Sequence, residues 1–172
     1  GGIGALQGGL GARRGAALAL AAEETFVKYA QKNPDAEHPV YCIGSEVPVP
    51  GGAQEAEAVT VTTAEDFRAC VRAFKNAFKA VGIGAAWEHV VGVVVQPGVE
   101  FGDDSVVEYN REAARALTNA LGGHPGLVFE GHSTDYQTKI RLREMIRDGI
   151  AILKVGPGLT FANREGMLAL SH

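Results

Sequence analysis

Val128-Phe-Glu-Gly-His-Ser-Thr-Asp-Tyr-Gln-Thr138 shows the architecture of this chain more clearly than any other segment. A short apolar run ends at Glu130, a polar loop follows, and a helical pattern begins after the loop. Ala151-Ile-Leu-Lys-Val-Gly-Pro-Gly-Leu-Thr160 repeats this order one unit later. The order is typical of a buried parallel strand, a functional loop and a helix N-terminus. The two segments therefore predict an α/β protein.

The same alternation extends outward from these segments along the chain. We expect strands over residues 40–47, 90–95, 127–130 and 150–155, and helices over 16–32, 62–81, 110–121, 137–148 and 159–170. A Thr-x-x-Glu capping box at Thr62 and Glu65 marks the start of the second helix. Asn110 is expected to cap the third helix, and Gly149 to stop the fourth. Four strands followed by helices predict a parallel sheet, either half of an eight-stranded barrel or a small open sheet.

Composition sets broad limits on the function. The chain has 172 residues, a formal net charge of −4 and 46% hydrophobic residues, which fits one domain with its own core. We expect no membrane partner, because no apolar run is long enough for a bilayer. We expect no nucleic-acid partner, because no basic stripe is present. Cys42 and Cys70 lack CxxC spacing, so both are expected to be buried thiols in a cytoplasmic protein.

The first fifteen residues, GGIGALQGGLGARRG, are almost half glycine. Glycine is costly to order, so we predict a disordered lead-in over residues 1–15 and a folded domain over 16–172. A phosphate-binding glycine loop is the weaker interpretation, because no strand precedes it and no GK[ST] ends it.

His132 is the strongest single candidate for chemistry. An imidazole at a strand end can bind Zn²⁺, or it can relay a proton near neutral pH. A loop histidine whose nitrogens are satisfied by ordinary hydrogen bonds is an equally good interpretation. The sequence leaves these alternatives open.

Two turns after the last two strands are candidates for phosphate binding. Ser133 and Thr134 precede one helix, and Gly156, Gly158 and Thr160 stand at the start of the next. Helix N-termini offer free amide groups to a phosphate, and barrel proteins bind phosphate after their last strands. The alternative is local: one of Ser133, Thr134 and Asp135 caps its helix, and the glycines serve only the turns.

Glu46 and Glu100 follow the first two strands and are candidate catalytic carboxylates. A carboxylate at a strand end can act as a general acid or base, or can orient sugar hydroxyl groups. The alternative is a loop carboxylate that caps a turn.

With Ile43-Gly-Ser-Glu-Val-Pro-Val-Pro-Gly-Gly52, Val93-Val-Val-Gln-Pro-Gly-Val-Glu-Phe101 and the two segments quoted first, the chain resembles one family from residue 16 to its end. That family is the accessory (non-catalytic) subunit of class II D-tagatose-1,6-bisphosphate aldolase. The resemblance implies parallel βα units of a TIM-type (β/α)8 barrel. It also implies that this chain is a fragment holding about half of the barrel, strands five to eight.

The resemblance also implies a function in tagatose 6-phosphate catabolism, in the breakdown of galactitol and N-acetylgalactosamine. The accessory subunit would bind a sugar phosphate and support a separate catalytic class II aldolase subunit. The alternative is a metal-dependent 4-epimerase that interconverts fructose 6-phosphate and tagatose 6-phosphate. Zn²⁺ is the expected cofactor there, with His132 as a ligand, although Gln96 stands near where the catalytic aldolases have a metal-binding histidine. No Walker or kinase-type loop is present, so we do not expect phosphoryl transfer.

Overall fold

The computed structural model describes residues 3–44 and 59–171. The elements are, in chain order, α1 (Ile3–Ala30), β1 (Tyr41–Ile43), α2 (Ala64–Ala80), η1 (Gly84–His89), β2 (Val90–Val95), β3 (Glu100–Phe101), β4 (Val106–Val107), α3 (Arg111–Ala120), η2 (Leu121–Gly123), β5 (Val128–Gly131), α4 (Lys139–Arg147), β6 (Ile150–Leu153) and α5 (Pro157–Leu170).

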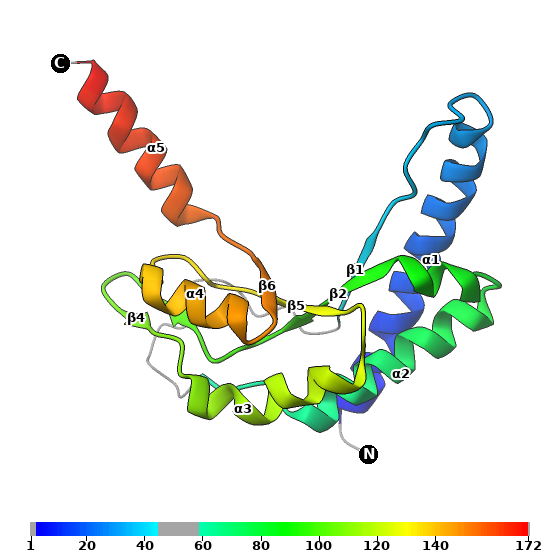
Figure 1. Ribbon diagram of the computed structural model, residues 1–172, viewed down its shortest axis with the longest axis horizontal. Coiled ribbons are helices and arrows are strands. Elements are labelled where there is room, and N and C mark those ends of the chain that lie inside the picture. Colours follow the sequence, from blue (N-terminus) through cyan, green and yellow to red (C-terminus); the bar gives the residue numbers. More distant parts are fainter. Residues whose placement is uncertain (1–2, 45–58, 172) are drawn as a thin grey trace.

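Four strands form one parallel sheet in the order β1-β2-β5-β6. All three pairings between neighbouring strands are parallel, as the strand–helix alternation predicts. Within the described residues, β1 and β6 lie at the two edges of the sheet (Figure 1). The α/β class is thus confirmed. Half of a barrel stays a prediction, since an open four-stranded sheet does not establish it.

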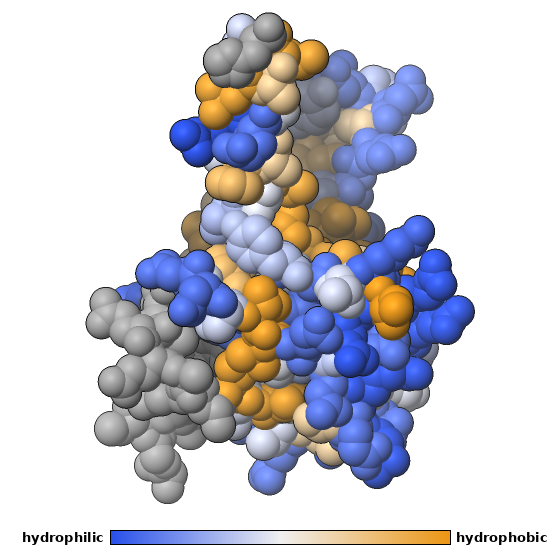
Figure 2. Space-filling model, turned by 90° about the vertical axis from the view of Figure 1, so that its left-hand side faces the viewer, coloured by the Kyte–Doolittle hydropathy of each residue, from blue (hydrophilic) through white to orange (hydrophobic). Residues whose placement is uncertain are grey.

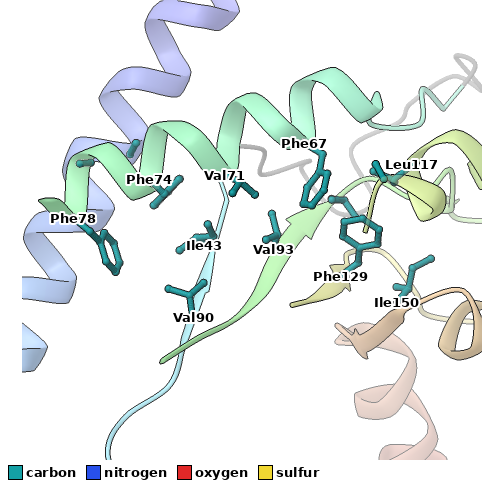
Figure 3. Close-up of a cluster of buried hydrophobic side chains, with 14 of the residues drawn as sticks. Ile43, Phe67, Val71, Phe74, Phe78, Val90, Val93, Leu117, Phe129 and Ile150 are labelled. Atoms are coloured by element: carbon teal, nitrogen blue, oxygen red, sulfur yellow. The ribbon is translucent and has the colours of Figure 1, made fainter. Parts of the chain in front are cut away.

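The core lies between this sheet and the helices below it in Figure 1. Helix α2 buries Phe67, Val71, Phe74 and Phe78, which share one face at the predicted helical spacing. Figure 3 shows this stripe over Val93 and other side chains of the strands. The opposing strand side chains are Ile43, Val90, Val93, Phe129 and Ile150, and Leu117 of α3 packs beside α2. The aromatic stripe is therefore core.

The predicted lead-in is the main difference from expectation in the N-terminal region. Helix α1 already begins at Ile3 and so includes most of residues 1–15. Its glycine and alanine residues let it pack closely against α2: a Cβ at Gly15 would lie 2.6 Å from Cε1 of Phe74. Ala12 and Ala16 are buried in the same contact region. Glycine here provides close helix packing, which the composition alone does not reveal.

Two helix starts lie later than predicted. Thr63, and not Thr62, caps α2 by accepting a hydrogen bond from the Asp66 amide, while the Thr62 hydroxyl accepts one from the Gln96 amide at 2.8 Å. Thr138 caps α4, so none of the residues 133–135 serves as its N-cap. Asn110 caps α3 as predicted, and Gly149, with a φ of 90°, follows the end of α4 as the predicted stop.

Helix α5 projects away from the sheet, and none of its described residues is buried (Figure 1). Apolar side chains are nevertheless spread along its surface, as the upper part of Figure 2 shows. The large exposed ones are Leu159, Phe161, Met167, Leu168 and Leu170. In the described part of the chain, no helix is both long and apolar enough to cross a membrane.

Candidate functional site

Buried polar side chains gather where β2 and β5 end. In the described chain, every buried polar or charged residue either follows one of these strands or bonds to a residue that does. They are Thr62, Gln96, Glu100, His132, Ser133, Thr134, Asp135 and Gln137. Because the strands are parallel, their carboxyl ends share one edge of the sheet. In open α/β sheets and barrels alike, this edge carries the ligand sites.

His132 is 4% exposed and belongs to this cluster. Its Nε2 lies 3.1 Å from Oε1 of Glu130, which belongs to the same strand segment. Its Nδ1 is buried and has no hydrogen-bond partner, and it is the only such side-chain atom in the part of the chain that the structure describes. Buried polar atoms are nearly always paired, so an unpaired one in a functional cluster points to a ligand.

Cys42 approaches the same carboxylate from β1. Partial desolvation of its sulfur, together with a hydrogen bond to Glu130, raises the pKa of the Cys42 thiol to about 11. The thiol therefore stays protonated at neutral pH. The expectation that both thiols are buried is wrong for Cys42, which is exposed on the face of β1 opposite to the buried Ile43, whereas Cys70 is half-buried.

Glu100 and Ser133 are brought together as the sequence suggests. The Ser133 hydroxyl donates to Oε2 of Glu100 at 3.2 Å, and the Phe101 amide donates to Oε1 at 3.0 Å. Ser133 has a φ of 55°, which is unfavourable for a residue with a Cβ. Such strain is concentrated at functional sites, where the surrounding structure maintains it.

The two predicted phosphate-binding turns contact each other, and the Gly156 and Gly158 amides of the second turn already have a partner. Oδ1 of Asp135 accepts hydrogen bonds from the Gly156 and Gly158 amides at 3.0 and 2.8 Å. Thr134 donates its hydroxyl to the Lys154 carbonyl at 2.8 Å. A carboxylate thus occupies the N-terminus of α5, as the helix dipole favours.

The remaining phosphate candidate, Thr160, donates its hydroxyl to the Gly156 carbonyl within the first turn of α5. A phosphate at this helix start would have to replace the carboxylate of Asp135. Phosphate binding by Ser133, Thr134, Gly156, Gly158 and Thr160 therefore stays a prediction.

Glu46 and the stretch 45–58 lie outside the described residues. Gln96 is inside them and shapes the turn after β2, since its Oε1 accepts from the Gly98 and Val99 amides at 2.8 and 3.0 Å. The amide side chain of Gln96 thus fixes the loop that leads to Glu100.

The donor set for a zinc ion is incomplete in the described chain. No group of three or more His, Cys, Asp and Glu side chains is placed there so as to hold a metal. A catalytic Zn²⁺ commonly has three protein ligands, of which the unpaired Nδ1 of His132 could be one. The described residues alone therefore do not fit a zinc site, although His132 has a nitrogen available for a ligand.

A hydrogen-bond network that the sequence did not reveal connects Gln137 of this cluster to the neighbouring helices. Gln137 accepts from the Tyr109 amide and donates to the Val107 carbonyl, both at 2.9 Å. Tyr109 in turn donates its hydroxyl to Asp148 at 3.0 Å. The Arg111 guanidinium, whose Nε donates to Asp148 at 2.8 Å, holds the pKa of the Asp148 carboxyl below its usual value. These contacts join the loop after β5 to α3 and α4.

The network residues are 28 to 39 positions apart in sequence, so no local motif announces them. The pair Glu130 and His132 did carry a signal, because residues i and i+2 of a strand share a face.

Comparisons with known proteins agree with this architecture. A family model described as "D-tagatose-1,6-bisphosphate aldolase subunit GatZ/KbaZ-like" matches residues 3–172. The chain is 52% identical over 133 residues to a D-tagatose 6-phosphate 4-epimerase of Agrobacterium fabrum, covering 77% of this chain and 31% of that protein.

A solved structure from Sinorhizobium meliloti 1021 is also similar. It is described as a probable tagatose 6 phosphate kinase and shares 50% identity with a TM-score of 0.66, over 76% of this chain and 31% of that one. This chain thus spans about a third of the length of the relatives it matches. Since the family model covers nearly every residue, the chain belongs to the GatZ/KbaZ-like family of D-tagatose-1,6-bisphosphate aldolase subunits.

Proposed function

We propose that this chain contributes part of the active site of a ketohexose-6-phosphate 4-epimerase, which interconverts tagatose 6-phosphate and fructose 6-phosphate. The observation that carries the proposal is the unpaired, buried Nδ1 of His132. Glu130 contacts the other ring nitrogen of His132, and Glu100 accepts a hydrogen bond from Ser133, the residue after His132. A protein that only supports a partner has no need of this arrangement. The similarity to a protein named D-tagatose 6-phosphate 4-epimerase supports the same proposal.

Inversion at C4 of such a sugar can proceed by cleavage and re-formation of the C3–C4 bond. A base removes the proton of the 4-hydroxyl group, C4 becomes an aldehyde, and the bonding electrons pass to an enolate of the three-carbon fragment. Re-addition to the opposite face of the aldehyde, with return of the proton, completes the inversion. The base must therefore take up and give back one proton in each turnover.

In the described chain, Glu100 is the candidate that carries this proton. It is 7% exposed, and hydrogen bonds from Ser133 and the Phe101 amide fix its orientation. Each carboxylate oxygen keeps a further lone pair that can accept the substrate proton. His132 and Ser133 would then orient the substrate hydroxyl groups, and the neighbouring helix start of α5 would lie near the phosphate. Glu46 remains a second candidate for proton transfer.

A second function is favoured by the description of the family itself, which is that of an aldolase subunit. In this role the chain would bind a catalytic class II aldolase subunit and raise its activity or stability. The exposed apolar side chains of α5 provide surface for such contacts. A zinc ion would then belong to the partner.

One experiment separates the two functions. The purified chain is incubated with tagatose 6-phosphate and a divalent metal, and in parallel it is added to a class II tagatose-bisphosphate aldolase whose cleavage rate is followed. Fructose 6-phosphate formed by the chain alone supports the epimerase. Stimulated cleavage without sugar conversion supports the accessory subunit and contradicts the epimerase.

Matched histidine variants keep this experiment specific. His132→Gln should abolish conversion, whereas His124→Gln should not, because His124 lies before β5 and packs against Phe67 of the core. Conversion that survives in His132→Gln would overturn the proposed site. Absence of both conversion and stimulation would contradict both functions for this chain.

A further inference from the structure

The two ring nitrogens of His132 have different surroundings, and this difference decides which of them can act. Nε2 faces Oε1 of Glu130 at 3.1 Å, whereas Nδ1 is buried without a partner. An ionised carboxylate can only accept hydrogen bonds, so Nε2 must carry the proton of this pair. A neutral imidazole has one N–H group, and Nδ1 is therefore left with a free electron pair.

The alternative protonation states fit the site less well. With the proton on Nδ1, the Glu130 carboxylate would face the lone pair of Nε2, and the buried N–H would have no acceptor. With both nitrogens protonated, Nδ1–H would again be a buried donor without an acceptor, which is unfavourable. Only the Nε2–H form satisfies the contact with Glu130 and leaves no buried donor unpaired.

Glu130 is itself held in place, so it can impose this state. It lies two residues before His132, and its side chain is 16% exposed. Cys42, from the far side of β2, bonds to the same carboxylate. Gly92 of β2 makes this approach possible, because a Cβ there would lie 2.7 Å from Sγ of Cys42 and 3.0 Å from Cδ1 of Ile152. Three strands thus combine to orient one carboxylate toward one imidazole.

We propose that Glu130 is a positioning residue that fixes His132 in the Nε2–H form, so that Nδ1 is the nitrogen presented to the ligand. The ligand is then an electron-pair acceptor, either a hydrogen-bond donor of the sugar or a cation completed by other residues. The catalytic use of Nδ1 rests on the proposed function, whereas the tautomer is a property of the free protein. Its test therefore needs neither substrate nor partner.

The test is nitrogen-15 NMR of the chain labelled at its histidines, in which coupling to the ring protons distinguishes protonated from unprotonated nitrogens. The His132 signals are identified by their loss in His132→Gln. At neutral pH we expect Nε2 of His132 to be protonated and Nδ1 to be unprotonated. A protonated Nδ1 in the unaltered chain, alone or together with Nε2, would overturn the proposal.

Two variants test the part played by Glu130. Glu130→Leu removes the acceptor while keeping a side chain of similar size, and we expect the preference for Nε2–H to be lost. Glu88→Leu makes the same chemical change at an exposed site before β2, at the opposite end of the sheet, and should leave the His132 signals unchanged. If Glu130→Leu folds poorly, Glu130→Gln, which retains one oxygen and the same shape, is measured instead. An Nε2–H preference that persists undiminished in Glu130→Leu would overturn the proposal, as would loss of it in Glu88→Leu.

Discussion

The layer between the sheet and helix α2 and the cluster at the carboxyl ends of β2 and β5 are both buried, but by different kinds of side chain. In the layer, apolar groups meet: Phe67 and Phe129 pack edge to face with ring centroids 5.0 Å apart (Figure 3). In the cluster, carboxylates, hydroxyls and an imidazole replace them. The cluster also contains the unpaired nitrogen of His132 and the strained backbone of Ser133.

This difference shows how one small sheet separates stability from chemistry. The helix-covered side stabilises the fold by removing apolar surface from water. The strand ends keep polar groups that contribute less to stability but can act on a ligand. Mutations in the apolar layer should therefore lower the stability strongly and change ligand binding little. Mutations in the polar cluster should weaken ligand binding strongly and change the stability little.

The largest expected effect is on the apolar layer. Phe129→Ala removes a fully buried ring and should lower the free energy of unfolding by about 3–5 kcal/mol. Phe161→Ala, on α5, removes a ring that is 54% exposed and should change it by no more than about 0.5 kcal/mol. Urea denaturation followed by circular dichroism measures both. Equal losses of unfolding free energy in the two variants would show that α5 is packed in solution. That result would contradict the assignment of stability to the layer between the sheet and α2.

A smaller effect is expected at the turn that leads into β6. Gly149 has a φ of 90°, and a Cβ there would lie 2.5 Å from Cδ2 of Leu121. Gly149→Ala should cost about 1–2 kcal/mol from the left-handed backbone alone. The control is Gly122→Ala, since a Cβ at Gly122 would meet no atom within 4 Å. If thermal unfolding shows the two variants to be equally stable, Gly149 does not have the left-handed backbone conformation in solution.

Asp148, which is bonded to Tyr109 and Arg111, should make the stability depend on pH. The Arg111 bond lowers the pKa of Asp148 in the folded protein below its usual value of 3.8. A lowered folded pKa stabilises the fold at pH values above 3.8, and this contribution is lost as the pH falls through the folded pKa. Asp148→Asn should therefore be less stable than the unaltered chain at pH 7, and the difference should shrink in acid. Stability curves that stay parallel between pH 7 and pH 2 would contradict this assignment.

The smallest effect on stability is expected at the cluster itself. His132→Leu removes an unpaired buried nitrogen together with one hydrogen bond to Glu130, and these changes oppose each other. We expect the free energy of unfolding to change by less than about 1 kcal/mol, because a buried group without a partner costs about as much as a hydrogen bond contributes. Thermal unfolding of this variant beside Phe129→Ala would check the contrast. A loss as large as that of Phe129→Ala would make His132 a core residue.

Much of the fold could be predicted because its signals are local. The run Val90–Val95 and the spacing of Phe67, Phe74 and Phe78 indicate a strand and a core-facing helix by their own periodicity. Helix α1 could not be predicted from residue 3, because the close packing that Gly15 permits is against Phe74, some sixty residues away. The hairpin of β3 and β4 has only two residues in each strand and leaves too short a pattern to recognise.

The sequence predicted where the candidate site lies, but it predicted few of the contacts between the site's residues. That Glu100 and Ser133 meet follows from the parallel order of strands, since the carboxyl ends of β2 and β5 share one edge. That Asp135 takes the amides of Gly156 and Gly158 depends on the geometry of two loops, which no spacing in the sequence reveals. Glu46, the other predicted carboxylate, lies outside the described residues.

The most direct test of the account is a titration of the nitrogen-15-labelled chain with tagatose 6-phosphate, followed amide by amide. We predict chemical-shift changes at residues 100–101, 131–136 and 156–158, and none in η1 or in the second half of α2. Binding confined to this edge would show that the polar cluster, and not the apolar layer, meets the sugar. Saturating tagatose 6-phosphate that shifts no amide there, or that shifts only amides elsewhere, would contradict the account.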